Sequence, residues 1–257
     1  MKFFLQLAVI RRIAVLITMG VVTASSAADV AGMLRQGDVE AAAHRNAAAL
    51  EIYLSADSAD PNNPDILRRI ANQYSQQTQG VGSQEEKVKL GESALAFAKR
   101  AVELAPESSE NRLTLAICYG RVALHESPRK QMEYSRLIKV ECEAALDLDP
   151  KNDYAWHVLG RWNYEMASLN PALRVIAEII FGGLPDASYE TAAGCFEKAV
   201  AIQPRSVIHQ VELGRTYLAM GRLDDARKHL ELGLSLPTKE KDDSESQALA
   251  RKALDSI

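Results

Sequence analysis

The chain has 257 residues, of which 47% are hydrophobic, 6% aromatic and 25% charged, and its formal net charge is −4. This length can bury a large core, either in one elongated domain or in two small ones. The acidic balance and the lack of a basic tract exclude nucleic acid as an expected partner. Ala and Leu are abundant and no long stretch alternates apolar and polar residues, so we expect an all-α protein.

Residues 1–28 have the composition of a targeting segment. Basic residues precede a ten-residue apolar core at 13–22, and small residues follow up to Ala28. This order is typical of a secretory signal peptide, here cleaved after Ala27 or Ala28. The alternative is an uncleaved membrane anchor, since residues 3–10 lengthen the apolar run. Removal of the segment takes three of the 30 basic residues and no acid, which leaves 27 against 34 and a formal charge of −7.

Five prolines divide the rest of the chain into apolar helical stretches. They are Pro61, Pro106, Pro150, Pro204 and Pro237, with gaps of 45, 44, 54 and 33 residues. Ten residues after each of the first four comes a small residue behind an aliphatic one, as in Leu213-Gly214. This constant spacing is typical of tetratricopeptide repeats, which are helix pairs of about 34 residues. The extra length of the longer gaps is therefore predicted to lie between the two helices of a pair.

The stretch from Tyr154 to Pro204 carries the clearest repeat pattern. The matching residues are Trp156, Leu159 and Gly160 in its first half and Ala192, Phe196, Ala199 and Pro204 in its second. A small residue lets the second helix approach the first, and a proline that cannot continue the helix sets the turn to the next pair. Between the two halves, residues 172–181 are predicted to form a short apolar helix that ends at Gly182-Gly183.

Both ends of the array are predicted to differ from its middle. Residues 29–63 are expected to be a helical cap or partial repeat, in which the second helix carries Tyr53 and the first is weak or missing. Helix pairs should occupy 64–237, and a polar-sided capping helix should occupy 238–257. The predicted fold is an all-α, tetratricopeptide-repeat-like, right-handed solenoid of about four helix pairs, with insertions between paired helices.

Three segments are more specific than a general repeat. They are Trp156-His-Val-Leu-Gly-Arg-Trp162, Pro185-Asp-Ala-Ser-Tyr-Glu190 and Leu234-Ser-Leu-Pro-Thr-Lys239. These segments resemble the regulator of microtubule dynamics family, and the resemblance covers roughly residue 64 to the C-terminus. It implies a tetratricopeptide fold and, for eukaryotic members, association with microtubules and organelle membranes. A secretory signal does not fit microtubule contact, so we interpret the chain as a bacterial relative exported to the periplasm.

Motifs for chemistry are absent from the sequence. The five histidines show neither His-Glu-x-x-His spacing nor a cluster with cysteine, and no glycine-rich phosphate loop follows a strand. Cys118, Cys142 and Cys195 are expected to be small core residues, with a Cys118–Cys142 disulfide as the alternative in an oxidising compartment. The resemblance offers no catalytic residues either. We therefore predict no catalytic residue, no metal, no cofactor and no enzyme activity.

A concave groove is the expected binding surface, because the first helices of stacked pairs line the inner side of a solenoid. The residues predicted to line it are Arg68, Asn72, Arg121, Tyr154, His157, Arg161, Tyr164 and Arg215. Arginine binds carboxylates with two parallel hydrogen bonds and tyrosine adds apolar contact, so an anionic or C-terminal peptide is the expected ligand. In the alternative, these arginines merely solvate the surface or pair with nearby acids. Trp156 and Trp162 are expected in the core.

These features together predict a non-enzymatic scaffold that binds a protein or peptide, and no nucleic acid, in an exported complex. The alternative is a membrane-anchored cytosolic adaptor associated with microtubules or organelles. Contact with a membrane is expected only if residues 1–28 stay attached.

Overall fold

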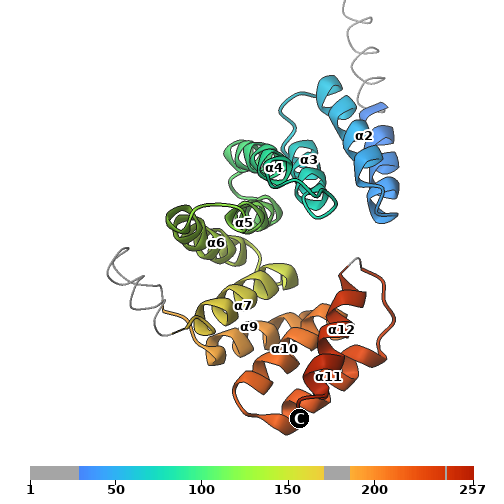
Figure 1. The fold of residues 1–257 in the computed structure, drawn as a ribbon. Helices are drawn as coiled ribbons and strands as arrows, with labels where there is room; N and C mark the ends of the chain where they lie inside the picture. Colours follow the sequence, from blue (N-terminus) through green and yellow to red (C-terminus); the bar gives the residue numbers. More distant parts are fainter. Residues whose placement is uncertain (1–28, 171–185, 241) are drawn as a thin grey trace, which may run out of the picture.

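The computed structural model describes residues 29–170, 186–240 and 242–257, and every regular element in these ranges is a helix (Figure 1). Residues 29–42 are helical. They are followed by α2 (Asn46–Ala59), α3 (Pro64–Gln77), α4 (Gln84–Leu104), α5 (Ser109–Ala123), α6 (Pro128–Leu148), α7 (Asp153–Ala167), α9 (Tyr189–Ile202), α10 (Val207–Ala219), α11 (Leu223–Ser235) and α12 (Asp243–Leu254). The predictions for 1–28 and for a helix at 172–181 lie outside the described residues.

The helices pack as successive pairs, which confirms the predicted tetratricopeptide-like solenoid. The most extensive contacts join α3 with α4, α5 with α6, α7 with α9 and α10 with α11. The turns between these pairs, and the one before α3, have the same length: 60–63, 105–108, 149–152 and 203–206. The extra residues lie within pairs, partly because α4 and α6 each have 21 residues while α9 has 14 and α11 has 13.

Capping side chains explain why most of these turns stop where they do. Asn63 accepts hydrogen bonds from the amides of Asp65 and Ile66, Ser108 from that of Asn111, and Asn152 from that of Ala155. Each bond satisfies an amide that has no partner within its own helix, and so favours starting the helix at the next residue. The start of each first helix is therefore encoded locally, next to the proline that follows the preceding helix.

Contacts between a small residue and a large one set the distance between paired helices. A Cβ atom added to Gly160 would lie 2.9 Å from the ring of Phe196, and one added to Gly214 would lie 2.7 Å from Cγ of Leu230. Phe196 and Leu230 are both 0% exposed. The helices can approach this closely only because the facing residue lacks a side chain.

The N-terminal unit has a first helix that the sequence pattern did not indicate. Residues 29–42 supply it, and its Val30 joins Ala49, Tyr53 and Ala56 of α2 in one buried cluster. A Cβ atom added to Gly37 would collide with the ring of Tyr53, the same arrangement as at Gly160 and Phe196. The segment before α3 is therefore a helix pair too.

The C-terminal helix α12 packs against both helices of the preceding pair, α10 and α11. The side-chain amide of Gln247 donates to the backbone carbonyls of Gly233, Leu234 and Leu236 at 2.9 to 3.3 Å. These carbonyls lie at the end of α11 and have no partner within that helix. Gln247 therefore gives a hydrogen-bond partner to carbonyls at the end of α11 that would otherwise be buried without one.

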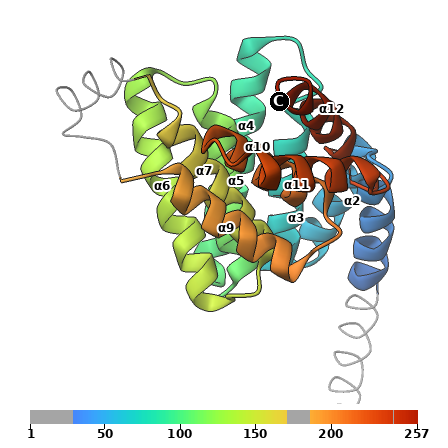
Figure 2. The same ribbon diagram turned by 90° about the horizontal axis from the view of Figure 1, so that it is seen from below.

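The row of pairs is curved, with the first helices on its inner side. Successive first helices touch one another: α3 touches α5, α5 touches α7, and α7 touches α10. Among the described second helices, no contact of this extent joins α4 to α6 or α9 to α11. The resulting bend is visible in two orthogonal views (Figure 1, Figure 2). The first helices α3, α5, α7 and α10 therefore line a concave face.

The close contact at Gly214 predicts that adding one methyl group there lowers the free energy of unfolding. We expect Gly214→Ala to destabilise the protein by about 1–3 kcal/mol, because the new Cβ meets Cγ of Leu230 and also its backbone nitrogen. Gly194→Ala in α9 is the matched control. Its Cβ meets nothing within 4 Å, so the better helix propensity of alanine should add about 0.5–1 kcal/mol. Urea unfolding measures both, and equal effects of the two substitutions would contradict the packing account.

Candidate functional site

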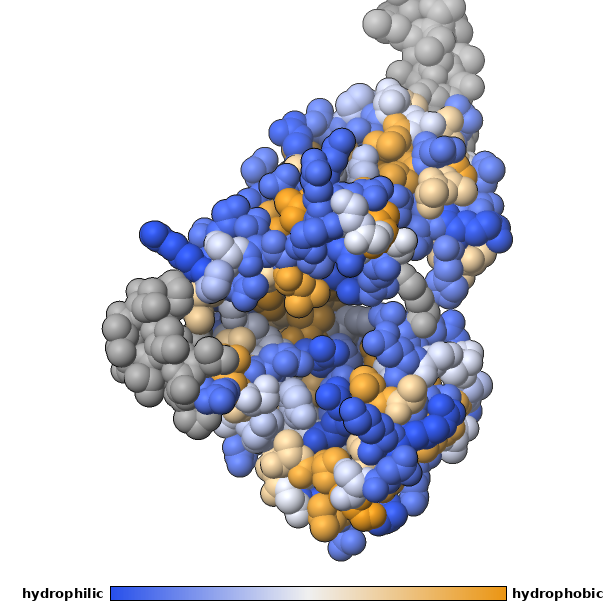
Figure 3. All heavy atoms as spheres, in the orientation of Figure 1, coloured by the Kyte–Doolittle hydropathy of each residue, from blue (hydrophilic) through white to orange (hydrophobic). Residues whose placement is uncertain are grey.

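The concave face opens as a hollow between the N-terminal helices and the C-terminal ones, with apolar atoms on its floor (Figure 3). Along α5, Leu113, Ile117 and Arg121 follow one another at intervals of four residues, so they share one side of the helix. All three are half-buried. This stripe of α5 offers two aliphatic side chains and one cation on a first helix.

Arg68 and Asn72 lie on α3, the neighbouring first helix. The Arg68 guanidinium contacts Asp65 at 2.7 Å within the helix and Glu110 of α5 at 3.3 Å. Its charge is therefore balanced by two acids, and it links α3 to α5. Asn72 lies about one turn further along and is half-buried.

Arg161 and Arg215 share one buried carboxylate. Glu212 has a side chain only 4% exposed, and its Oε1 is 3.3 Å from Nη1 of Arg161 and 2.9 Å from Nη1 of Arg215. Arg161, which belongs to α7, also contacts Glu165 at 3.5 Å. The ring of Tyr164 lies 5.4 Å from the Arg215 guanidinium carbon. This cluster ties α7 to α10, since a buried carboxylate needs such partners.

The pairing of the arginines follows the alternative in which they meet nearby acids, with one exception. Arg68, Arg161 and Arg215 each have an acidic partner, as described above. Arg121 forms no ion pair with any residue in the described ranges, and it is half-buried. Arg121 is thus the predicted groove arginine whose charge is uncompensated.

His157 is not a surface residue of the groove. It is 9% exposed, and its Nδ1 lies 3.0 Å from Nδ1 of His209, which is 0% exposed. Nε2 of His209 lies 2.9 Å from Oδ2 of Asp153. The Tyr154 ring covers His209 in a T-shaped contact with a centroid distance of 5.7 Å, and Tyr154 itself is 38% exposed. The prediction that His157 faces a partner is therefore corrected: its ring joins α7 to α10 from within.

Burial determines the protonation state of this network. It lowers the pKa of His157 well below 6.5, and the charges of His209 and Arg161 act in the same direction. Burial also lowers the pKa of His209, although Asp153 opposes that shift. Both rings are neutral at pH 7, so Nε2–H of His209 donates to Asp153 and Nδ1–H of His157 donates to Nδ1 of His209. Burial and nearby acids, Glu240 first, raise the pKa of Tyr154 to about 12, so the phenol keeps its proton.

The two tryptophans differ in their surroundings. Trp162 is 5% exposed, and its indole N–H donates to the backbone oxygen of Ser135 at 2.8 Å. Trp156 is half-buried, donates to the carbonyl of Pro150 at 2.9 Å and is covered by Lys198, whose Nζ lies 3.8 Å from the ring centroid. The expectation of a core position holds for Trp162, whereas Trp156 lies at the edge of the core.

The three cysteines are buried and free. Burial raises the pKa of the Cys118 thiol to about 12 and that of Cys195 to about 11. A thiol with so high a pKa is a weak nucleophile, because the thiolate is the reactive form. The expectation that these cysteines are core residues is confirmed.

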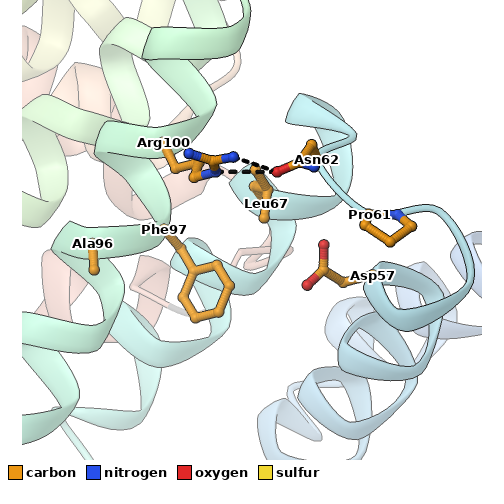
Figure 4. Close-up of a pocket in the computed structure, with 7 residues that line it drawn as sticks. All are labelled: Asp57, Pro61, Asn62, Leu67, Ala96, Phe97 and Arg100. Atoms are coloured by element: carbon orange, nitrogen blue, oxygen red, sulfur yellow. Dashed lines mark hydrogen bonds between the residues drawn. The ribbon is translucent and has the colours of Figure 1, made fainter.

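A separate cavity of about 290 Å³ lies beside the turn between α2 and α3 (Figure 4). Its lining residues are Asp57, Pro61, Asn62, Leu67, Ala96, Phe97 and Arg100. The Arg100 guanidinium donates to Oδ1 of Asn62 at 2.5 and 3.2 Å. Several of these residues are largely exposed, and none of them belongs to the predicted groove. The cavity is a shallow, open pocket on the side of the array formed by the second helices α2 and α4, away from the concave face.

The described part of the chain consists of residues 29–170, 186–240 and 242–257. In these ranges no three His, Cys, Asp or Glu side chains come together in a way that could hold a metal ion. Likewise, none of the helices there combines the length and apolar character needed to span a bilayer.

The profile of regulator of microtubule dynamics protein 1-3 matches residues 33–257. The chain belongs to the regulator of microtubule dynamics family. Protein 1 of that name from Bos taurus is 30% identical over 197 residues, which cover 76% of this chain and 62% of that protein. Protein 1 from Homo sapiens is 31% identical over 68% of this chain and 56% of that protein.

Another member, regulator of microtubule dynamics protein 3 from Rattus norvegicus, is 27% identical over 222 residues, or 85% of this chain and 47% of that protein. The chain thus spans between 47% and 62% of the length of these three relatives. The similarity therefore concerns one part of each relative, and in this chain the matched residues 33–257 include the array of helix pairs.

Solved structures agree on the fold of this family member. A thermophilic TPR protein of Thermus thermophilus superposes with a TM-score of 0.64 and 19% identity, over 88% of this chain and 98% of that one. PilW, a type IV pilus biogenesis factor, superposes with a TM-score of 0.58 and 16% identity, over 89% of this chain and 87% of that one. At such low identity the likeness establishes the tetratricopeptide fold alone.

The shared carboxylate predicts that one glutamate matters more than its neighbour. We expect Glu212→Gln to destabilise the protein by about 1–3 kcal/mol, because it leaves two guanidinium groups beside a neutral amide. Glu165→Gln is the control, since it removes an exposed partner of the same Arg161 and should cost less than about 0.5 kcal/mol. Thermal and urea unfolding check both values. A cost at Glu212 no greater than that at Glu165 would show that the buried carboxylate does not hold α7 against α10.

Proposed function

We propose that the chain is a non-enzymatic scaffold that holds a protein or peptide on the concave face formed by α3, α5, α7 and α10. The observation that carries the proposal is the hollow with an apolar floor on the concave face. On α5, one of the helices of this face, Arg121 lacks an acidic partner among the described residues. Apolar side chains give a partner most of its binding energy, and an uncompensated charge gives it orientation. The tetratricopeptide fold and the membership of the family support the same function.

The partner's chemistry follows from which groove residues remain available. Arg68, Arg161 and Arg215 form ion pairs with acidic residues of the same chain. Attraction of an anionic segment therefore depends mainly on Arg121. Leu113 and Ile117 offer apolar contact on the same side of α5. The ligand proposed is therefore a peptide segment in which aliphatic or aromatic side chains stand near one acidic residue. Asn72 and Tyr154 are proposed as flanking contacts.

The cellular setting proposed is an exported complex, and the composition of residues 1–28 supports it. The alternative is a membrane-anchored cytosolic adaptor associated with microtubules or organelles, and the names of the family relatives, which refer to microtubule dynamics, support an association with microtubules. Mass spectrometry of the N-terminus of the protein from its native cells separates the two. Loss of 27 or 28 residues fits export, while an intact segment recovered with membranes fits the adaptor.

Charge reversal at Arg121 tests the groove. We expect Arg121→Glu to lower recovery of bound partners at least tenfold, which corresponds to about 1.4 kcal/mol, because like charges then oppose the acidic residue of the ligand. The control is Arg129→Glu, an exposed arginine near the start of α6 that should leave recovery unchanged. Quantitative affinity capture with each variant, after circular dichroism has verified its fold, gives the answer. Recovery of the same partners in the same amounts by Arg121→Glu would remove the groove assignment.

A further inference from the structure

We propose that the joint between α7 and α10 is a proton-sensitive element, and that uptake of two protons by His157 and His209 loosens it and the concave face beside it. Such loosening would regulate binding at the concave face, so the biological role of this element rests on the proposed scaffold function. Its test requires no partner, so the two can fail separately.

The geometry places the two histidines where they join one helix pair to the next. α7 and α10 approach each other only over a short stretch. The hydrogen bonds and ion pair between their described side chains are Asp153–His209 and His157–His209, at 2.9 and 3.0 Å, and Arg161–Glu212. A change in the histidine pair therefore acts on two of these three links.

The first proton can be accepted without loss of a hydrogen bond. His157 is slightly exposed while His209 is fully buried, so the proton enters at Nε2 of His157. The hydrogen on Nδ1 of His157 then passes to Nδ1 of His209. The product is a His209 imidazolium that donates to Asp153 through Nε2–H and to the neutral His157 through Nδ1–H. Both bonds survive, and the carboxylate of Asp153 faces the new charge.

The second proton cannot be accommodated in this way. It makes donors of both Nδ1 atoms, which face each other at 3.0 Å, so the bond between the rings is lost. Two cations would then lie with ring centroids 5.0 Å apart in a buried site. Like charges in such a site repel strongly and are poorly solvated. The joint relieves both effects by opening.

Charged and aromatic groups from α7, α9, α10 and the start of α12 surround the two histidine rings. Asp153 and Arg161 of α7 act on the pair directly, α9 contributes the Phe196 ring at 5.5 Å from His157, and Glu212 of α10 is occupied by two arginines. Glu240 and Asp242, which precede α12, and Asp243, its first residue, act on the Tyr154 phenol that covers His209.

Burial holds the pKa of each ring below 6.5, so an opened joint binds protons more readily than a closed one. Closure is therefore complete above pH 6.5 and weakens as the pH falls below it, by up to about tenfold per pH unit for each proton taken up.

Hydrogen exchange of the full chain at pH 7.5 and 5.5 tests the proposal, with times corrected for the pH dependence of the chemical exchange step. We expect the protection of amides in α7 and α10 to fall at least tenfold more than that of α3 and α4 in the same molecule. His157→Asn keeps a hydrogen-bonding group near the place of Nδ1 but does not titrate, so it should reduce this difference. His44→Asn, at an exposed residue with φ of 57°, is the control and should behave as the wild type.

A fall in protection at α7 and α10 that is no greater than at α3 and α4 would overturn the proposal, as would an unchanged response in His157→Asn. If that variant fails to fold, the titration of the histidine rings of the wild type by NMR decides instead. The expected result is that His157 and His209 titrate below pH 6.5, and titration of both at or above it would refute the element. If the expected loss of protection in α7 and α10 is seen but the protein binds no partner, the proposed scaffold function is refuted and the proton-sensitive joint is not.

Discussion

The close approach of two helices at a residue without a side chain is the contact on which the rest of this structure depends. Paired helices approach closely where a glycine faces a large side chain, as Gly160 faces Phe196 and Gly214 faces Leu230. The same contact occurs at the N-terminal end, where Gly37 faces Tyr53. Turns of constant length then join each pair to the next in the same way. Repetition of one joint produces a curved array, and the first helices necessarily share its inner side.

The inner side is less cationic than its sequence suggests. Three of its arginines are engaged by Glu110, Glu212 and other acids. The Arg68–Glu110 and Arg161–Glu212 pairs connect one repeat to the next. The joint between α7 and α10 is unusual because it combines this electrostatic link with a buried pair of histidines. Stability and binding are thus connected here, since the same side chains that hold two repeats together also border the surface offered to a partner.

The order of the helices could be predicted from the sequence because its signals are local. Prolines, capping residues such as Asn63 and Asn152, and small residues at fixed offsets each act within one turn or one pair. The sequence predicts a weak or missing first helix in 29–63, because the Trp and Leu-Gly residues of the repeat pattern are absent from 29–42. In the structure this helix packs through Val30, Met33 and Leu34, and its Gly37 faces Tyr53. The groove was predicted less well. His157 meets His209 across 52 residues and Arg161 meets Glu212 across 51, so only the folded chain reveals that both are engaged internally.

The central claim is that the array leaves its inner side open for another polypeptide. The most direct measurement is photo-crosslinking with two variants. One carries a photoreactive amino acid in place of Ile117 on the first helix α5, and the other in place of Val140, which is 54% exposed on the second helix α6. After irradiation in the native cells, the account predicts covalent adducts with a discrete partner from position 117 and none from position 140. Adducts that form only from position 140 would contradict it.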